Sequence, residues 1–205
     1  MFSTEDEHSR DWKKIDFKKE QNKLDTFVKE FTSLLNTLQI TYAIVSGYVA
    51  ILFGRSRTSE DVDILVEKLD FKIFITVWNT IISNDFYCIN TKHINDAYEQ
   101  YLFHGICLRF AKKDTFIPNI KFKSPKTELD NWTIQERVYV SLNHHYFYIS
   151  PLELQIPFKL HLGSEKDIED AKFLYGIFQE HLDMLLLRDF NRKLKTQRLF
   201  QRYLQ

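Results

Sequence analysis

The sequence predicts an α+β protein, in which helices flank a mixed β-sheet and further helices form the C-terminal region. Three observations lead to this class. An amphipathic helical pattern precedes the first apolar run, strand-like and helix-like runs then alternate over residues 40–149, and helical spacing continues to the end. We expect residues 1–150 to hold the first helix and the α/β core, and residues 151–205 to form helices packed on that core.

The first part of the chain follows a helix, strand, helix, strand order. Apolar residues at three- and four-residue spacing predict a helix from about residue 11 to residue 38. An apolar run predicts a buried strand over 40–45, followed by a short helix over 48–53 and a second strand over 62–66. Two strands flanking a helix indicate a right-handed crossover that places the second strand near one edge of the sheet.

The middle of the chain is less regular. Helical spacing returns over 71–83, a third strand is expected over 85–89, and one or two further strands over 101–111. Residues 112–132 contain two prolines and several lysines and are expected to form an exposed hairpin or loop. Alternating apolar residues then predict strands over 134–140 and 145–149.

The C-terminal third carries helix start and stop signals. Ser150 is the expected N-cap of a helix, and Pro157 is expected to kink or interrupt that helix. Ser164 is the expected N-cap of a helix that reaches residue 178, and residues 182–204 supply one or two more.

Composition excludes few functions. The 28 basic and 28 acidic residues give zero formal net charge, so only local patches can indicate nucleic-acid binding. Cys88 and Cys107 stand singly in apolar runs and are expected to be free thiols. No apolar stretch is long enough to span a bilayer, and the N-terminus lacks a signal-peptide pattern. These features predict a soluble cytoplasmic protein without membrane contact.

The candidate site lies in residues 42–67. A strand that ends at Ser46-Gly47 and leads into a helix leaves backbone N–H groups free to bind an anion. Asp61 and Asp63 stand two residues apart on the next strand and therefore project from the same face. Such a pair holds Mg²⁺ through oxygen ligands while the metal also binds substrate phosphates. The stretch therefore indicates metal-assisted phosphoryl chemistry.

Two motifs together resemble a known superfamily. The first is Ser46-Gly47 followed by the segment GRSRTSEDVD at 54–63, and the second is a downstream segment over 150–171 that contains Lys159-Leu160 and EKDIED. In this order they resemble the nucleotidyltransferase superfamily, which has the fold of DNA polymerase β and the minimal nucleotidyltransferases. Within that superfamily the chain looks similar to the AbiEii-type toxin group.

The resemblance implies a function and a set of site residues. It implies Mg²⁺-dependent transfer of a nucleoside monophosphate from an NTP to a hydroxyl of RNA, protein or a small molecule. It also raises the hypothesis of an antitoxin-like partner. The residues it assigns are Asp61 and Asp63 for catalysis and metal binding, and Ser46, Gly47, Arg57, Thr58 and Lys159 for the nucleotide.

One position departs from the superfamily pattern. The superfamily uses a third carboxylate on a later strand, and Arg109 stands at the aligned position here. Arginine cannot act as a base or a metal ligand. Glu99 and Asp114 are the nearby carboxylates that could substitute, although both are expected to lie off the strand. The departure favours an alternative, a non-catalytic member of the fold that binds a nucleotide, RNA or a partner protein.

Other charged residues allow a structural interpretation beside the functional one. Lys159 is either a phosphate contact or a helix lysine whose stem covers apolar surface. Asp167 is expected to cap a helix, and Asp170 to pair with Arg57 or Lys159. The basic, amphipathic segment 188–202 is either a packing helix or a surface for an RNA backbone.

Overall fold

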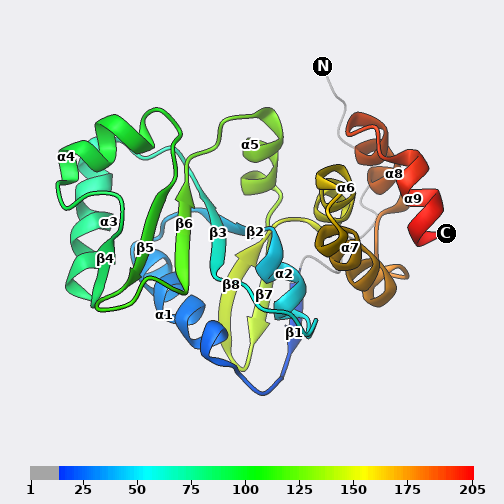
Figure 1. Ribbon diagram of the computed structural model, residues 1–205, viewed down its shortest axis with the longest axis horizontal. Helices are drawn as coiled ribbons and strands as arrows, with labels where there is room; N and C mark the ends of the chain where they lie inside the picture. The colour runs from blue at the N-terminus through cyan, green and yellow to red at the C-terminus, as the bar shows by residue number, and fades with distance from the viewer. Residues whose placement is uncertain (1–13) are drawn as a thin grey trace.

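The computed structural model describes residues 14–205, which form an eight-stranded mixed sheet flanked by helices, with the C-terminal helices α6–α9 grouped beside it (Figure 1). The predicted α+β class is therefore confirmed. The predicted start of the first helix, at residue 11, lies outside the described residues. The strands are β1 (Lys14–Phe17), β2 (Tyr42–Val45), β3 (Asp61–Val66), β4 (Phe86–Cys88), β5 (Leu108–Lys112), β6 (Asn119–Lys123), β7 (Val138–Leu142) and β8 (His145–Ile149).

The helices connect these strands and complete the C-terminal region. None of the helices within residues 14–205 is both long and apolar enough to cross a membrane. The helices are α1 (Lys23–Thr37), α2 (Gly47–Leu52), α3 (Phe71–Ser83), α4 (Ile94–Asp96), the π-helix η2 (Ala97–Leu102), α5 (Glu128–Gln135), α6 (Leu152–Leu162), α7 (Glu165–Phe178), α8 (Met184–Lys193) and α9 (Gln197–Leu204).

The strand order is β1-β7-β8-β2-β3-β6-β5-β4, so β2 and β3 lie in the middle of the sheet. They run antiparallel, with Val45 opposite Asp63. The predicted crossover between two parallel strands is therefore wrong. Because the strands are antiparallel, the turn that follows β2 lies at the same end of the sheet as the start of β3. This topology brings Ser46 toward Asp61 and Asp63.

Strand β6 is the main departure from the predicted elements. It lies between β3 and β5, inside the segment that is predicted to be an exposed hairpin or loop. It pairs antiparallel with β5, as a hairpin strand would, but it is part of the main sheet and not exposed. Its buried residues Ile120 and Phe122 pack into the core. Pro118 and Pro125 flank the strand and do not interrupt it, so they are compatible with its ladder. The rest of the expected loop contains α5, which begins after a Thr127 capping box.

Smaller departures occur at both ends of the chain. Residues 14–17 form β1, where a helix was predicted, and pair in parallel with β7. Helix α6 begins after Pro151, not after Ser150, and continues through Pro157 without interruption. The Ser164 cap of α7 is confirmed, because its side chain accepts a hydrogen bond from the N–H of Asp167.

The core lies between the sheet and helices α1 and α3. Phe31 of α1 contacts the rings of Phe86, Phe110 and Phe122, which come from three neighbouring strands. The side chains of β3 that face this core, including Ile64, are buried. The opposite face of the same strands is therefore left for polar residues, and the candidate site is built there.

The environment of His145, at the start of β8, leads us to expect that the free energy of unfolding depends on pH. Burial, followed by the charge of Lys29, lowers the pKa of its imidazole to about 4. The ordinary histidine pKa is about 6.5, so between these values the unfolded chain binds a proton that the folded chain does not. The contribution of His145 to the free energy of unfolding is therefore fully present above pH 6.5, and it is lost as the pH falls toward 4.

The measurement is urea unfolding of the natural chain and of His145→Gln at pH 7 and pH 4.5. We expect the natural chain to lose more stability between these pH values than the variant does. The exposed His93→Gln is the control and should behave like the natural chain. An equal loss in all three chains would contradict the prediction.

Candidate functional site

Asp61 and Asp63 lie on the face of β3 that points away from the α1–α3 core. Both are partly exposed, whereas Val62 and Ile64 between and after them are fully buried. The two carboxylates therefore share one face, as strand alternation requires.

The neighbouring strands bring cations to this face. Strand β6 pairs in parallel with β3, and its register places Asn119 opposite Asp61 and Lys121 opposite Asp63. Strand β5 is one strand further out, with Arg109 opposite Lys121. Arg109 therefore does not occupy the strand next to the aspartates. The residue beside Asp63 is Lys121, which lies in the segment predicted to be an exposed hairpin or loop.

These residues form a compact lysine–aspartate cluster, which comprises Asp61, Asp63, Arg109, Lys121 and Lys123. The Lys121 ammonium lies 2.6 Å from Asp61 Oδ2, and the Arg109 guanidinium donates to Asp61 Oδ1 at 3.1 Å. The Lys123 ammonium lies 2.5 Å from Asp63 Oδ1. Both aspartates of the predicted metal pair are thus paired with cations of the protein itself.

The protonation states follow from these contacts. Burial acts to raise the pKa of Asp61, but hydrogen bonds from Lys121, Asn119 and Arg109 outweigh it and lower the pKa below its ordinary value. Burial acts to lower the pKa of Lys121, but the hydrogen bond to Asp61 and the charges of both aspartates raise it. Both partners are therefore charged at neutral pH.

The cations paired with Asp61 and Asp63 disfavour a magnesium ion at this face. Within residues 14–205, no group of three or more His, Cys, Asp or Glu side chains is placed to hold a metal ion. Glu99 lies in η2 and Asp114 in the turn after β5, so neither supplies a third carboxylate to the cluster. Two unit charges 4 Å apart interact by about 4 kcal/mol at an effective dielectric constant of about 20, and a divalent ion doubles the repulsion from each neighbouring cation.

The Ser46 turn is held by the C-terminal region. Gln155 of α6 accepts a hydrogen bond from the Ser46 N–H at 3.3 Å and donates one to the Ser46 carbonyl at 2.8 Å. The Ser46 backbone has a φ of +67°, which is uncommon for a residue with a side chain. Gly47 then lies against the guanidinium of Arg57, whose Nη2 would be 3.0 Å from an added Cβ. Thr58 is exposed and accepts a weak hydrogen bond from Arg57 through its carbonyl.

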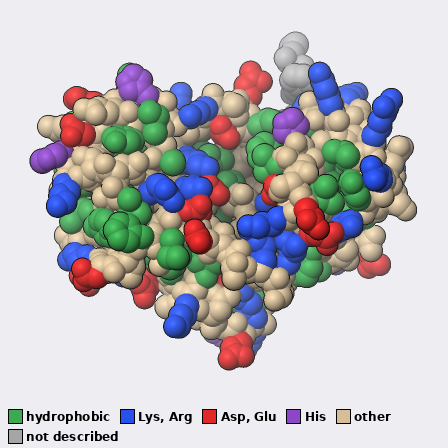
Figure 2. Space-filling model, viewed as in Figure 1, with side chains coloured by type: hydrophobic (Ala, Val, Ile, Leu, Met, Phe, Trp, Pro, Cys, Tyr) green, Lys and Arg blue, Asp and Glu red, His purple; other side chains and the backbone are tan. Residues whose placement is uncertain are grey.

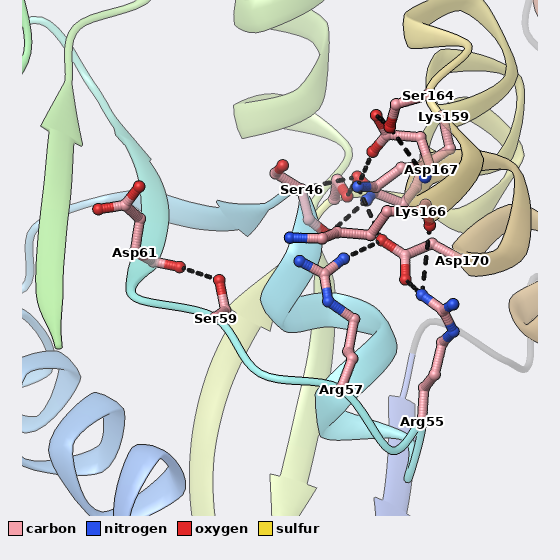
Figure 3. A network of polar contacts seen from close by, with 12 residues as sticks. Ser46, Arg55, Arg57, Ser59, Asp61, Lys159, Ser164, Lys166, Asp167 and Asp170 are labelled. Carbon is pink, nitrogen blue, oxygen red and sulfur yellow. Dashed lines mark hydrogen bonds and ion pairs between the residues drawn. The ribbon is translucent and has the colours of Figure 1, made fainter. Parts of the chain in front are cut away.

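A second charged group, which we call the Asp170 cluster, comprises Arg55, Arg57, Lys159, Asp167 and Asp170. The fully buried Asp170 carboxylate accepts from Arg55, from Arg57 at 2.5 Å and from Lys159 at 2.9 Å. Lys159 is only 2% exposed and also lies 2.5 Å from Asp167. The cluster joins the loop before β3 to α6 and α7 (Figure 3). Arg57 and Lys159, the predicted nucleotide contacts, are thus paired with carboxylates. The predicted pairing of Asp170 with Arg57 or Lys159 is confirmed for both cations.

A cavity of about 640 Å³ opens between the sheet face, α5 and α6. Figure 2 shows a recess between the two halves of the molecule, with Lys and Arg side chains on both sides. Ser46, Asp63 and Lys123 form part of its polar edge. Its apolar walls include Leu65, Ile106, Leu129, Leu154, Phe158 and Leu162. An apolar cavity with a few convergent polar groups is the usual form of a small-molecule site.

Lys166 is a further residue to which the sequence analysis assigned no role. Figure 3 shows its side chain extending from α7 in the direction of the β3 face. Lys166 is exposed. Lys121, Lys123 and Lys166 are thus the cations that the sequence-based prediction missed. The alternation of polar and apolar residues in Asn119–Lys123 was a signal that could have revealed the first two.

Comparison with known proteins identifies the fold. No protein family and no curated protein matches the sequence. An antigenic nucleotidyltransferase-like protein from Paracoccidioides brasiliensis is similar in structure, with a TM-score of 0.54 and 17% identity over 87% of this chain and 90% of that chain. The antibiotic-resistance factor ANT(2'')-Ia gives a TM-score of 0.52 at 10% identity over 86% of this chain and 96% of its own.

A structure of ANT(2'')-Ia in complex with adenylyl-2''-tobramycin is similar as well, with a TM-score of 0.52 over 82% of this chain and 97% of that chain. The chain therefore has the nucleotidyltransferase fold, as the two sequence motifs indicated. At these levels of identity the likeness concerns the fold alone. Membership of the AbiEii-type group stays a prediction.

Proposed function

We propose that this chain is a non-catalytic nucleotidyltransferase-fold protein that binds a nucleotide without Mg²⁺. The observation that carries the proposal is the pairing of Asp61 and Asp63 with Arg109, Lys121 and Lys123. Within residues 14–205, these three cations and two carboxylates give the cluster a net charge of +1, since 3 − 2 = 1. The built-in cations do what a metal ion would otherwise do, because they neutralise the aspartates and leave positive charge for an anion.

The phosphates would bind at the polar edge of the cavity. An ammonium group has three N–H donors, and Lys123 uses one of them on Asp63. The remaining donors, together with the Ser46 hydroxyl and Lys166, can contact phosphate oxygens. The apolar part of the 640 Å³ cavity has the size and chemistry to hold the base. ANT(2'')-Ia, which has this fold, has been solved with an adenylylated compound, and this supports a nucleotide as the ligand.

The same contacts argue against nucleotidyl transfer. A general base must accept a proton, and its pKa is best matched to the working pH. The pKa of Asp61 is instead lowered, and Lys121, Arg109 and Asn119 already use its oxygens. Asp61 is therefore a weak base, and the three cations of the cluster repel a metal ion that would activate an incoming hydroxyl.

Replacing Lys123 tests the proposal. We expect Lys123→Gln to weaken NTP binding in EDTA about 10- to 100-fold, because hydrogen bonds to charged groups are each worth about 1.5–3 kcal/mol. The measurement is isothermal titration calorimetry with each NTP. The control is Lys72→Gln, an exposed lysine of α3 on the far side of the sheet, which should bind as the natural chain does.

A label-transfer assay addresses the competing function. The chain is incubated with Mg²⁺ and each α-labelled NTP, with total RNA and total protein as acceptors. The proposal predicts no labelled product. Transfer of label that disappears in Asp61→Asn would overturn the proposal and establish a metal-dependent transferase.

A further inference from the structure

A second cavity of about 530 Å³ lies next to the first. The linings of both include Gly105, Ser124 and Lys126, so the two cavities adjoin at these residues. Gly105 has a φ of +65°, and a Cβ added there would lie 2.4 Å from Lys126 Cε. The partition between the cavities is therefore a lysine stem lying against a glycine, which a bound ligand can displace without moving the backbone.

The second cavity is basic and aromatic. Within residues 14–205, its lining contains Lys68, Lys126 and His104 but no Asp or Glu. In that same part of the chain, neither lysine ammonium has an ion-pair or hydrogen-bond partner. Such a lining is complementary to an anion, and the uncompensated lysines offer charge that no protein carboxylate uses.

Phe103 provides an open aromatic surface at this cavity. Its side chain is 73% exposed, and the adjacent His104 ring packs against it edge-on at 5.5 Å. Tyr98, which also lines the cavity, is fixed by a hydrogen bond to the Leu69 carbonyl and by contacts with other rings. Phe103 is thus free to stack with a ligand. Lysines that follow a backbone, with aromatic rings that stack on bases, are the features that bind single-stranded nucleic acids.

We propose that the two cavities together bind a single-stranded oligonucleotide. The terminal nucleotide occupies the first cavity, the next phosphate lies at Lys126, and the following base stacks on Phe103 with its phosphate near Lys68. This inference rests on the proposed function, because it takes the first cavity as the nucleotide site. It adds the ligand class, a chain of at least two nucleotides. Cavities of about 640 and 530 Å³ have room for single nucleotides and not for a duplex, which favours a single strand.

The test is fluorescence anisotropy of the full chain with labelled tetranucleotides, in separate RNA and DNA arms, beside calorimetry with a mononucleotide. We expect Phe103→Ala to weaken tetranucleotide binding about 10-fold and to leave mononucleotide binding unchanged. The matched control is Phe116→Ala, because Phe116 is 72% exposed but lines neither cavity. Lys68→Gln should reduce the slope of log affinity against log salt by about 0.7 for the tetranucleotide.

The outcomes separate this inference from the proposed function. Equal effects of Phe103→Ala and Phe116→Ala, or a tetranucleotide that binds no more tightly than the mononucleotide, would overturn the oligonucleotide site while mononucleotide binding stands. Tetranucleotide binding that depends on Phe103, without measurable mononucleotide binding, would support the oligonucleotide site formed by the two cavities. It would overturn the proposal that a mononucleotide is the ligand. If neither binds, both proposals fail. The RNA and DNA arms show whether the 2′-hydroxyl contributes.

Discussion

Replacing Asp170 with Asn is expected to lower the free energy of unfolding by about 3–5 kcal/mol. The Asp170 carboxylate is fully buried and accepts from Arg55, Arg57 and Lys159. With an amide of the same shape, Asp167 is the carboxylate that still pairs with this group within residues 14–205, and the cations stay largely buried. Removing one member of a buried charged group is costly because the remaining charges stay desolvated.

The measurement is urea unfolding followed by circular dichroism. The control is Glu169→Gln on the same helix, whose exposed ion pair with Lys172 should contribute about 0–1 kcal/mol. Adding Lys159→Met to Asp170→Asn should recover part of the lost stability, because it removes one of the buried uncompensated charges. Equal stabilities of Asp170→Asn and Glu169→Gln would show that the Asp170 cluster does not hold the C-terminal helices to the loop before β3.

Replacing Lys121 with Asp is expected to abolish most metal-independent nucleotide binding, by more than about 100-fold. The substitution changes the net charge of the lysine–aspartate cluster from +1 to −1, since two cations would then face three carboxylates. Residue 121 lies opposite Asp63 in the β3–β6 register. Three carboxylates would therefore converge on one face of the sheet, which is the oxygen-rich arrangement that divalent cations prefer.

Calorimetry with NTP in EDTA measures the loss, and calorimetry with Mn²⁺ alone measures the expected gain of a metal site. Lys113→Asp is the control, since it makes the same charge change at an exposed turn. Nucleotide binding by Lys121→Asp as tight as that of the natural chain would refute the role given to the cluster.

The fold was largely predictable because its signals are local. Apolar periodicity predicted α3 with the bounds observed, and the motif Ser46-Gly47 marked the turn between β2 and α2. The place of β6 inside the main sheet was not predicted, because Pro118 and Pro125 suggested an exposed hairpin or loop, whereas both lie just outside the strand. The alternation within β6 was visible but short, and burial against β3 and β5 stabilises a strand that its flanking prolines did not suggest.

The site was predictable only in part, because its character depends on the pairing between strands. The sequence places Asp61 and Asp63 on one face, but it does not show which strand lies beside them. The sequence places Arg109 where the superfamily has its third carboxylate. In the structure Arg109 lies two strands away from β3 and still reaches Asp61. Lys121 and Lys123 become partners of the aspartates only through the β3–β6 register. Asp170, expected to pair with Arg57 or Lys159, contacts both because α6, α7 and the loop converge on it.

The most direct test of the central claim is a titration of NTP into the natural chain, first in EDTA and then at increasing Mg²⁺. Because the cations of the lysine–aspartate cluster neutralise Asp61 and Asp63, we predict that binding is measurable in EDTA and that Mg²⁺ does not tighten it beyond its effect as a salt. Binding that appears only when Mg²⁺ is added, and that disappears in Asp61→Asn, would contradict the account.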